Sequence, residues 1–417
     1  MPNETHLDLA VIGAGPAGLA AAVKARQLGI KNLLVFERDE RPGGILPQCI
    51  HNGFGLKNFK EELTGPEYAN RYISMAATSR VDIALDTMVL DIDKDRTISV
   101  VSSRGGLRKY KCKSIILAMG CRERPRGAIG TPGTRPAGIF TAGQAQRLVN
   151  IEGYMPGEEI VIQGSGDVGM IMARRLTLEG AHVAAVTEIL PYSSGLIRNE
   201  VQCLHDFDIP LLLSHTVSEI HGENRVEGVS VVGVDHAWEP VAGTERFIAC
   251  DTLLLSVGLI PENELSKMAG IHLDPLTGGP YVNEHLETGV RGLFSCGNVL
   301  HVNDLVDDVS AEGEIAARGA YFRIKDKSPD KRKAIRIKGD ETIGQIVPQV
   351  ISGDHTVTIH IRVKRQMQKM VLRIGDLLER KFPYARPSEM IRVRLTRKIL
   401  AELGDSVKTL SIRCEER

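Results

Sequence analysis

The sequence is poor in aromatic residues and has no long apolar run. Aromatic residues make up 4% of its 417 residues, with a single Trp, which argues against a surface that stacks nucleic-acid bases. No apolar run approaches the roughly 18 residues of a membrane-spanning helix, and the first residues lack the basic and apolar blocks of a signal peptide. We therefore expect a cytoplasmic protein with no nucleic-acid partner and no transmembrane segment.

The sequence also lacks paired cysteines. Its seven cysteines form neither a C-x-x-C nor a C-x4-C pair. Their odd number and wide spacing are typical of reduced thiols rather than of a disulfide framework, and they contain no iron–sulfur ligand run. We predict no redox disulfide and no metal site.

Charge is balanced over the whole chain but not along it. Residues 331–417 hold 20 Lys and Arg against 10 Asp and Glu, whereas residues 1–330 hold 32 against 42. Such a basic segment is either a docking surface for a protein or an anionic lipid, or a solvated β face whose Lys and Arg protect edge strands. Short β-like runs between turns predict a small β-rich domain here.

Two stretches repeat one pattern at an offset of 151 residues. In each copy an apolar run leads into a G-x-G-x-x-G turn, a helical segment, a second apolar run and an acid. The paired positions are Gly13, Gly15, Gly18, Gly29 and Glu37, which recur as Gly164, Gly166, Gly169, Gly180 and Glu188. The glycines permit a tight turn, a nearby pyrophosphate and close helix packing, and the acid accepts hydrogen bonds from a ribose diol. The pattern predicts an α/β protein with two Rossmann-like dinucleotide-binding domains.

A second repeat supports the first. Residues 112–120 (CKSIILAMG) and 250–258 (CDTLLLSVG) share a cysteine, a polar pair, an apolar strand and a final glycine, at an offset of 138 residues. Each half therefore repeats a strand-closing element as well as a glycine turn.

This order of motifs resembles the two-dinucleotide-binding-domain flavoproteins of the glutathione-reductase-like pyridine nucleotide disulfide oxidoreductase superfamily, over roughly residues 7–325. The resemblance implies FAD in the first fold and NAD(H) in the second, with the NAD domain inserted in the FAD domain. We place the FAD domain at residues 1–135 and 259–330, the NAD(H) domain at 136–258, and a basic β-rich C-terminal domain at 331–417.

The resemblance also implies which residues contact the cofactors. Those expected at FAD are Gly13, Gly15, Pro16, Ala17, Gly18, Glu37, Arg38, Gly43, Gly44, Val89, Ala118, Gly120, Gly297 and Asn298. Those expected at NAD(H) are Gly164, Gly166, Asp167, Val168, Gly169, Glu188 and Gly258. Asn298 stands where the family usually has Asp, and its amide can still donate and accept hydrogen bonds. Glu188 would repel a 2′-phosphate, which favours NAD(H) over NADP(H).

Two residues are candidates for catalysis, although hydride transfer between nicotinamide and flavin needs no protein acid or base. The two redox cysteines of disulfide reductases would fall on Leu46 and His51 of this chain. Cys49 is then either a single redox thiol or a small buried side chain. His51 either bonds the flavin or a substrate, or is structural.

A narrower resemblance lies in PGGILPQCIHNGFGL, LAMGCRERPRG, FTAGQAQ and CGNVLHVNDLVD. These segments are similar to the flavoprotein subunit found with glycerol-3-phosphate-dehydrogenase-like proteins in anaerobic bacteria. This implies an electron-transfer subunit of a multi-subunit dehydrogenase, which passes electrons between NAD(H) and a second flavoprotein. We expect an oligomer, with peripheral membrane contact through the basic domain as one use of its charge.

Two other interpretations stay open. The first is a free-standing NADH:acceptor reductase that acts on oxygen, quinone or a disulfide and uses Cys49. The second is a nucleotide-binding assembly subunit that is not an enzyme.

Overall fold

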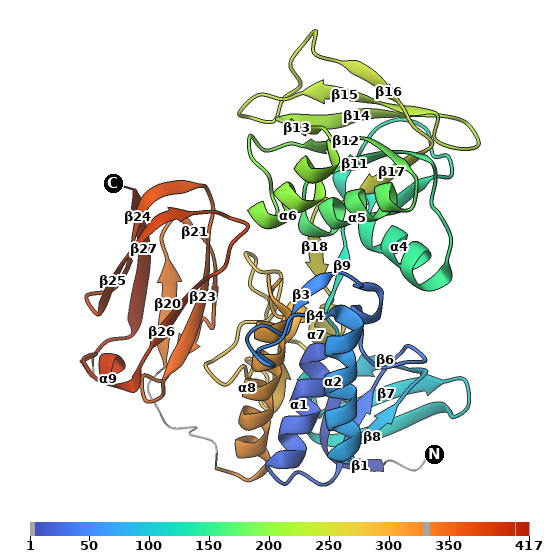
Figure 1. Cartoon of the computed structure of the whole chain (residues 1–417). Helices are drawn as coiled ribbons and strands as arrows, with labels where there is room; N and C mark the ends of the chain where they lie inside the picture. The colour runs from blue at the N-terminus through green and yellow to red at the C-terminus, as the bar shows by residue number, and fades with distance from the viewer. Residues whose placement is uncertain (1–4, 328–333, 405, 417) are drawn as a thin grey trace. The chain divides into compact units, whose positions relative to one another are not determined.

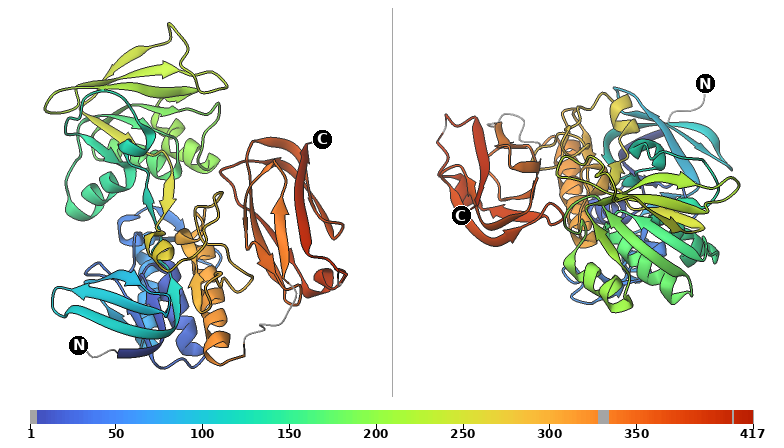
Figure 2. Two further views of the ribbon diagram at one scale, coloured as in Figure 1. Left: turned by 180° about the vertical axis from the view of Figure 1, so that it is seen from behind. Right: turned by 90° about the horizontal axis from the view of Figure 1, so that it is seen from above.

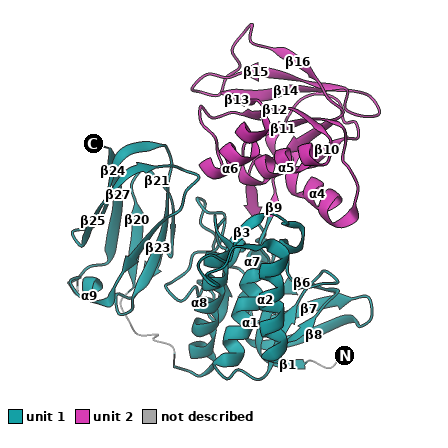
Figure 3. Cartoon of the chain, viewed as in Figure 1, with its two compact units in different colours: residues 1–121, 261–417 teal, residues 122–260 magenta. Residues whose placement is uncertain are grey.

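The computed structural model describes residues 5–327, 334–404 and 406–416 (Figure 1). The chain divides into two compact units, which we call unit 1 (residues 1–121 and 261–417) and unit 2 (residues 122–260) (Figure 3). Unit 2 is inserted in unit 1, and each unit holds one glycine turn. Unit 2 begins 14 residues before the predicted start of the NAD(H) domain at residue 136 and ends two residues after its predicted end at residue 258. The predicted limit after residue 330 lies outside the described residues.

The α/β part of unit 1 is built on a seven-stranded sheet in the order β5-β2-β1-β8-β7-β6, with β19 paired to β8. Its strands are β1 (Thr5–Ile12), β2 (Leu33–Phe36), β5 (Asp82–Ala84), β6 (Thr87–Ile92), β7 (Thr97–Ser102), β8 (Gly106–Leu117) and β19 (Leu293–Ser295). β8 runs parallel to β1 and β19 but antiparallel to β7, so the sheet combines a parallel core with an antiparallel meander.

Both faces of this sheet are covered, because alternate side chains of β1 enter different cores. Leu9 and Val11 pack with three helices, whereas Ala10 and Ile12 pack with the meander. The helices of unit 1 outside its C-terminal region are α1 (Pro16–Gln27), α2 (Gly65–Thr78), α7 (Glu264–Met268) and α8 (Val306–Ile324). α1 packs against both α2 and α8 and lies between them (Figures 1 and 2). Helices thus cover one face of the parallel strands, and the antiparallel end of the same sheet covers the other face.

Short elements connect this framework to the predicted flavin-facing loop. They are η1 (Leu46–Gln48), β3 (Asn52–Phe54), β4 (Leu63–Thr64) and η4 (Gly297–Val299). α2 begins at a capping box, in which the Thr64 hydroxyl accepts a bond from the Glu67 N–H and the Glu67 carboxylate accepts one from the Thr64 N–H. This fixes where the loop ends and the helix begins.

The C-terminal region of unit 1 is a β-sandwich, which confirms the predicted β-rich domain. One sheet has the order β22-β20-β27-β24-β25 and the other has the order β21-β23-β26. The elements are β20 (Ile335–Gly339), β21 (Ile343–Val347), β22 (Val350–Ile351), β23 (Val357–Val363), β24 (Met367–Ile374), β25 (Leu378–Ala385), β26 (Ile391–Leu395), α9 (Arg397–Leu400) and β27 (Thr409–Glu416). The two sheets face each other (Figure 2), and apolar residues of both form one core between them. We call this region the C-terminal sandwich.

Unit 2 repeats the dinucleotide fold with a parallel sheet in the order β10-β17-β11-β12-β13. Its parallel strands are β10 (Ile139–Thr141), β11 (Glu159–Gln163), β12 (His182–Glu188), β13 (Leu211–Leu213) and β17 (Thr252–Leu255). Its helices are α3 (Arg126–Ile129), α4 (Ala142–Arg147), η2 (Leu148–Glu152), α5 (Asp167–Leu178), α6 (Ile197–Cys203) and η3 (His205–Phe207). Helices including α5 pack on one face of this parallel sheet. On its opposite face lies an antiparallel sheet of β14 (His215–His221), β15 (Gly228–Gly233) and β16 (Arg246–Ala249).

The connection between the units is a two-stranded ribbon of β9 (Cys121–Glu123) and β18 (Leu259–Pro261). Within the described ranges, none of the helices has the length and apolar character that a bilayer crossing requires.

Candidate functional site

The first glycine turn joins β1 to α1 in unit 1. Gly13 follows β1 with a φ of +101°, and a Cβ there would lie 2.5 Å from the carbonyl oxygen of Ala118. A Cβ on Gly18 would lie 1.8 Å from the carbonyl oxygen of Gly13. The fold itself therefore requires glycine at both positions.

Gly15 differs from these two glycines, because the surrounding protein does not require it. An added Cβ would meet only the Cα of Gly44, at 3.8 Å, and the φ of Gly15 is −76°. Pro16 begins α1, Ala17 is buried behind it, and the first turn carries no acidic side chain. A glycine with free space around it, at a helix N-terminus whose first turn has no acidic side chain, is suited to bind a phosphate. This turn therefore fits the pyrophosphate of a dinucleotide.

The second glycine turn, between β11 and α5, follows the same plan with one addition. Gly164 has a φ of +94°, and a Cβ there would lie 2.2 Å from the carbonyl oxygen of Ser256. Ser256 occupies the place of Ala118 in the 138-residue repeat, and its hydroxyl accepts a bond from the Gly169 N–H at 3.1 Å. A Cβ on Gly166 would lie 3.0 Å from the same hydroxyl. The turn is thus anchored by a side-chain bond that Ala118 cannot make.

The start of α5 differs from that of α1 because it carries an acid. The Asp167 carboxylate accepts bonds from the Leu196 N–H at 2.8 Å and from the Asn199 amide at 2.7 Å. Val168 is half-buried against the core of unit 2. The side chains of Asp167 and Val168 thus have protein partners, so their backbone N–H groups are the groups suited to a phosphate.

The two acids of the repeat bind their own glycine turns. Glu37 accepts bonds from the N–H groups of Ala14 at 2.7 Å and Asp39 at 2.9 Å. Glu188 accepts bonds from the N–H and hydroxyl of Ser165, at 3.0 and 2.6 Å, and from the Leu190 N–H at 3.0 Å. A carboxylate has about four acceptor sites. Each acid therefore keeps capacity for a ribose hydroxyl.

The Gly43–Gly44 turn packs against the first glycine turn. The Gly43 N–H donates to the Ala14 carbonyl at 2.9 Å, and a Cβ on Gly44 would lie 2.9 Å from the Gly15 Cα. This contact brings a second stretch of glycine backbone beside Gly15, where the sequence predicts the FAD pyrophosphate.

Two of the residues expected at FAD, Arg38 and Val89, lie near one hollow of about 250 Å³. Arg38 and Met88 line it together with residues of β7. Val89, the neighbour of Met88, is buried on β6. The structure thus brings Arg38 and the strand of Val89 to one surface of unit 1.

The strand-closing glycines of the second repeat have open surroundings. Ala118 donates its N–H to the Ile12 carbonyl at 2.9 Å and closes β8 against β1. A Cβ on Gly120 would meet no protein atom within 4 Å, and one on Gly258 would meet only the Arg124 guanidinium carbon, at 3.9 Å. Both glycines therefore leave space for a ligand.

Gly297 and Asn298 lie in η4, between β19 and α8. The Gly297 N–H donates to the Glu312 carboxylate at 2.7 Å, and a Cβ on Gly297 would lie 2.9 Å from that of Ala17. The Asn298 side chain accepts a bond from the Asn303 N–H at 3.0 Å and donates to the Cys121 sulfur at 3.6 Å. The amide oxygen and the amide nitrogen can each make a further hydrogen bond, so Asn298 remains able to bind a ribityl hydroxyl.

Cys49 and His51 follow η1. The Cys49 thiol donates to the Ile45 carbonyl at 3.4 Å, and burial raises its pKa to about 12. His51 Nδ1 bonds the Asn52 carbonyl at 3.0 Å, and its ring lies 5.0 Å from that of Phe54. Because a thiolate is the reactive form of cysteine, this geometry favours the structural interpretation of Cys49. None of the seven cysteines is in a disulfide.

Several residues with a part in the site were not predicted from the sequence. The 138-residue repeat aligns Ser256 with Ala118, and the 151-residue repeat aligns Ser165 with Ala14, so both serines could have been found from the sequence. Glu312 belongs instead to a buried group with His301 and His360 that offers ligand atoms for a metal. No spacing rule joins these three residues.

Burial and charge set the protonation of this group. Burial lowers the pKa of His360 to about 4. For Glu312, burial alone would raise the pKa, but the neighbouring His301 holds it below its usual value.

Comparison with known proteins identifies the family. The model of the pyridine nucleotide-disulphide oxidoreductase family matches residues 7–316. One of the subunits of the opine oxidase of Agrobacterium tumefaciens (strain Ach5) is 29% identical over 288 residues, which are 64% of this chain and 55% of that protein. The chain thus spans little more than half the length of that relative.

Thioredoxin reductases match over more of their length. The enzyme of Bacillus subtilis (strain 168) is 27% identical over 333 residues, which are 78% of this chain and 97% of that protein. The crystal structure of T. acidophilum thioredoxin reductase shares the fold with a TM-score of 0.63 at 23% identity, and covers 76% of this chain and 98% of its own.

The family match contains both glycine turns, both acids and the Gly297–Asn298 segment. It confirms the two-dinucleotide-fold architecture, and the cofactors of the family are FAD and NAD(P)H. The chain belongs to the pyridine nucleotide-disulphide oxidoreductase family and is an FAD-dependent NAD(P)H oxidoreductase.

Proposed function

We propose that this chain is the NAD-linked electron-transfer subunit of a multi-subunit dehydrogenase, whose partner is a glycerol-3-phosphate-dehydrogenase-like flavoprotein. The observation that carries the proposal is the presence of two complete glycine turns in a chain without a neighbouring pair of cysteines. A disulfide-reducing relative passes electrons through two nearby thiols. This chain has to pass them to an acceptor outside itself.

The residues of the chain bind and orient the cofactors in this scheme. The chemistry that bound FAD would supply is two-electron transfer between NADH and the next acceptor. Gly15, Gly43 and Gly44 leave room for the FAD pyrophosphate beside the N-terminus of α1. Glu37 holds the first glycine turn in shape and keeps an acceptor for the ribose.

NADH rather than NADPH is the proposed donor because Glu188 is a buried carboxylate at the end of β12. A 2′-phosphate beside it would be repelled. The two arginines of α5 are engaged elsewhere: Arg174 lies over the Phe207 ring, and Arg175 pairs with Glu179 at 2.6 Å.

The partner is inferred from the narrower sequence resemblance and from the opine oxidase relative, which is by name one subunit of its enzyme. The basic residues 331–417 offer a docking surface for such a partner or for an anionic membrane. Assembly into an oligomer and a cytoplasmic location belong to the same proposal.

A free-standing NADH:disulfide reductase is the second candidate, and the match to thioredoxin reductase over 97% of that protein favours it. In this chain such an activity would depend on Cys49 alone, since no second cysteine lies near it in the sequence. The high pKa of Cys49 makes it a weak nucleophile at neutral pH.

The two candidates differ in which acceptor reoxidises the protein. We expect NADH-reduced holoprotein to reduce ferricyanide rapidly and an aromatic disulfide slowly, with both rates unchanged in Cys49→Ser. With the glycerol-3-phosphate-dehydrogenase-like flavoprotein present, NADH should reduce the flavin of that protein, and it should do so only when this chain is also present. Rapid disulfide reduction that Cys49→Ser abolishes would instead establish the second candidate.

A further inference from the structure

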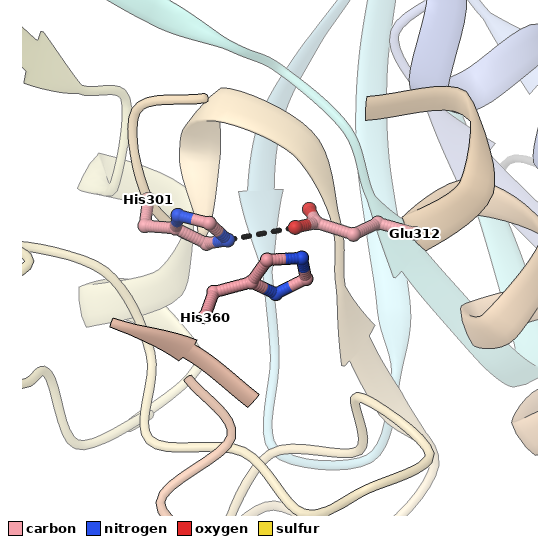
Figure 4. A group of neighbouring side chains, drawn as sticks. All are labelled: His301, Glu312 and His360. Atoms are coloured by element: carbon pink, nitrogen blue, oxygen red, sulfur yellow. Dashed lines mark hydrogen bonds and ion pairs between the residues drawn. The ribbon is translucent and has the colours of Figure 1, made fainter. Parts of the chain in front are cut away.

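Three potential metal ligands meet inside unit 1, where the C-terminal sandwich contacts the α/β part. His301 follows η4, Glu312 lies on α8 and His360 lies on β23. Figure 4 shows the three side chains pointing toward one another, and their ligand atoms lie within 4.8 Å of one another. The residues are 0%, 2% and 9% exposed. Two imidazoles and a carboxylate are a ligand set that proteins use for zinc.

The outer atoms of two of these side chains already have partners that orient them. Glu312 Oε2 accepts the Gly297 N–H at 2.7 Å, which leaves Oε1 facing His301 Nε2 at 2.7 Å. On the far side of the His301 ring, Nδ1 lies 3.4 Å from the Gln345 amide nitrogen. When that amide is turned so that its oxygen accepts the Nδ1–H, Nε2 offers its lone pair to a cation. Such outer partners hold metal ligands in their binding orientation.

His360 is the least satisfied member of the group. Among the described residues its ring has no hydrogen-bond partner, although its centroid lies 5.4 Å from that of His301. The charged or titratable groups around it are Glu312, His301, Arg392 and Asp308. A buried neutral imidazole without a partner has a lone pair to offer to a cation.

A second observation concerns Asn303, next to the group. Its amide nitrogen lies 3.5 Å from Glu312 Oε2, while its Oδ1 is buried and has no donor in the described structure. A buried acceptor without a donor is uncommon, because it loses its bonds to water without replacement. A cation in the group would supply the missing partner, either directly or through a bound water.

The surrounding charges leave a place for a cation. Arg362 pairs with Asp304, and Arg392 pairs with Asp308, which also pairs with Lys57 at 3.0 Å. Glu312 has no Lys or Arg partner among the described residues. A buried carboxylate requires a compensating charge, which either His301, its ion-pair partner at 2.7 Å, or a bound cation supplies.

We propose that His301, Glu312 and His360 bind a divalent transition-metal ion of the zinc type, which fastens the C-terminal sandwich to the α/β part of unit 1. In the bound form each ligand atom lies about 2.0–2.2 Å from the ion. The Glu312 and His301 atoms then separate to about 3.3 Å, as tetrahedral geometry requires. The ion takes no part in hydride transfer, so this proposal stands apart from the proposed function.

The experiment measures metal content in full-length holoprotein that is expressed without a polyhistidine tag in zinc-supplemented medium. We expect about one zinc ion per chain in the wild type, and loss of at least nine-tenths of it in His360→Ala and Glu312→Gln. The control is His355→Ala, which removes an exposed histidine from the same sandwich and should keep its zinc.

Thermal unfolding of the wild type gives a readout that does not depend on the variants. A chelator should lower the Tm by about 4 °C or more, and zinc but not magnesium should restore it. Cobalt added to the stripped protein should give the visible absorption bands of a tetrahedral site. Wild-type protein without stoichiometric metal and without a zinc-dependent Tm would overturn the proposal and leave the group as a histidine–carboxylate ion pair.

Discussion

Glu188 accepts hydrogen bonds from both the backbone N–H and the hydroxyl of Ser165, at 3.0 and 2.6 Å. In the other copy of the repeat, Glu37 makes the equivalent backbone contact with Ala14 at 2.7 Å. The acid that the fingerprint assigns to the ribose therefore also fixes the shape of the turn that faces the pyrophosphate. Substitutions of either acid should affect both binding and stability.

Replacing Glu188 should shift cofactor preference toward NADPH. Glu188→Gln keeps an acceptor but removes the charge, so we expect the KM for NADH to rise about tenfold and the ratio of kcat/KM for NADPH over NADH to increase. Glu188→Ala also leaves the N–H groups of Ser165 and Leu190 without a hydrogen-bond acceptor, which should lower the free energy of unfolding by about 1–3 kcal/mol. Steady-state kinetics and urea unfolding measure the two effects.

The control is Glu179→Ala, which removes only a partly exposed partner of Arg175 and should leave the cofactor ratio as it is. An unchanged ratio in both Glu188 variants would contradict the NAD assignment.

Gly15 and Gly18 should respond differently to an added methyl group. Gly15→Ala meets no protein atom closer than 3.8 Å, so the chain should fold but lose FAD, because the methyl group occupies the space of the pyrophosphate. Gly18→Ala places its methyl 1.8 Å from the Gly13 carbonyl oxygen and should destabilise unit 1 itself. The FAD-to-protein ratio and the Tm separate the cases. Full FAD content in a folded Gly15→Ala protein would remove Gly15 from the cofactor site.

The Cys49 thiol should remain protonated throughout the neutral pH range. Burial raises its pKa from 9.0 to about 12, so the folded state holds this proton more tightly than the unfolded chain. Its contribution to stability is therefore complete below about pH 9 and is lost as the pH rises toward 12. Alkylation of Cys49 by iodoacetamide, followed by mass spectrometry, should increase about tenfold per pH unit up to pH 10 without a plateau.

Cys49→Ser should accordingly keep NADH oxidation within about twofold at pH 7. A plateau in the alkylation rate below pH 8 would show an activated thiolate and would favour the disulfide-reducing alternative.

Arg362 should be a principal contact that holds the C-terminal sandwich in unit 1. Its guanidinium pairs with Asp304 and donates to the Val302 carbonyl, and Asp304 also accepts the Met390 N–H at 2.7 Å. The two charged side chains are 15% and 12% exposed. Because Arg362→Ala leaves a buried carboxylate without its cation, the free energy of unfolding should fall by about 3 kcal/mol.

The matched variant is Arg373→Ala on β24, whose pairs with Glu379 and Glu415 are exposed and should contribute about 0–1 kcal/mol. Equal losses in the two variants would mean that Arg362 does not hold the sandwich.

The sequence predicted the parts of the fold that rest on local chemistry. Gly13 and Gly164 need a positive φ and a close approach to a strand end, so they appear at fixed spacing in both copies and reveal the repeat. The strand alternation of residues 335–416 likewise predicted a β-rich domain, because apolar periodicity sets which side of a strand is buried. These features depend on residues that are close together in the chain.

Contacts between distant segments could not be predicted in this way. Strand alternation places Ile359 and Ile361 in the sandwich core and His360 on the opposite face of β23. It does not show that His360 meets Glu312, since that depends on how the sandwich docks. Asp167 illustrates the same limit within a motif. Its place after the glycine turn predicts a cofactor contact, but the structure engages its carboxylate with Leu196 and Asn199, which lie on a later segment.

Anaerobic titration of the purified holoprotein with NADH, followed through the flavin absorption band, is the decisive experiment for electron transfer from NADH to the flavin. We predict stoichiometric loss of the oxidised-flavin band with NADH, little loss with NADPH at the same concentration, and full recovery when ferricyanide is added. A protein that binds flavin but is not reduced by NADH would contradict the proposed function, as would a purified protein with no affinity for FAD.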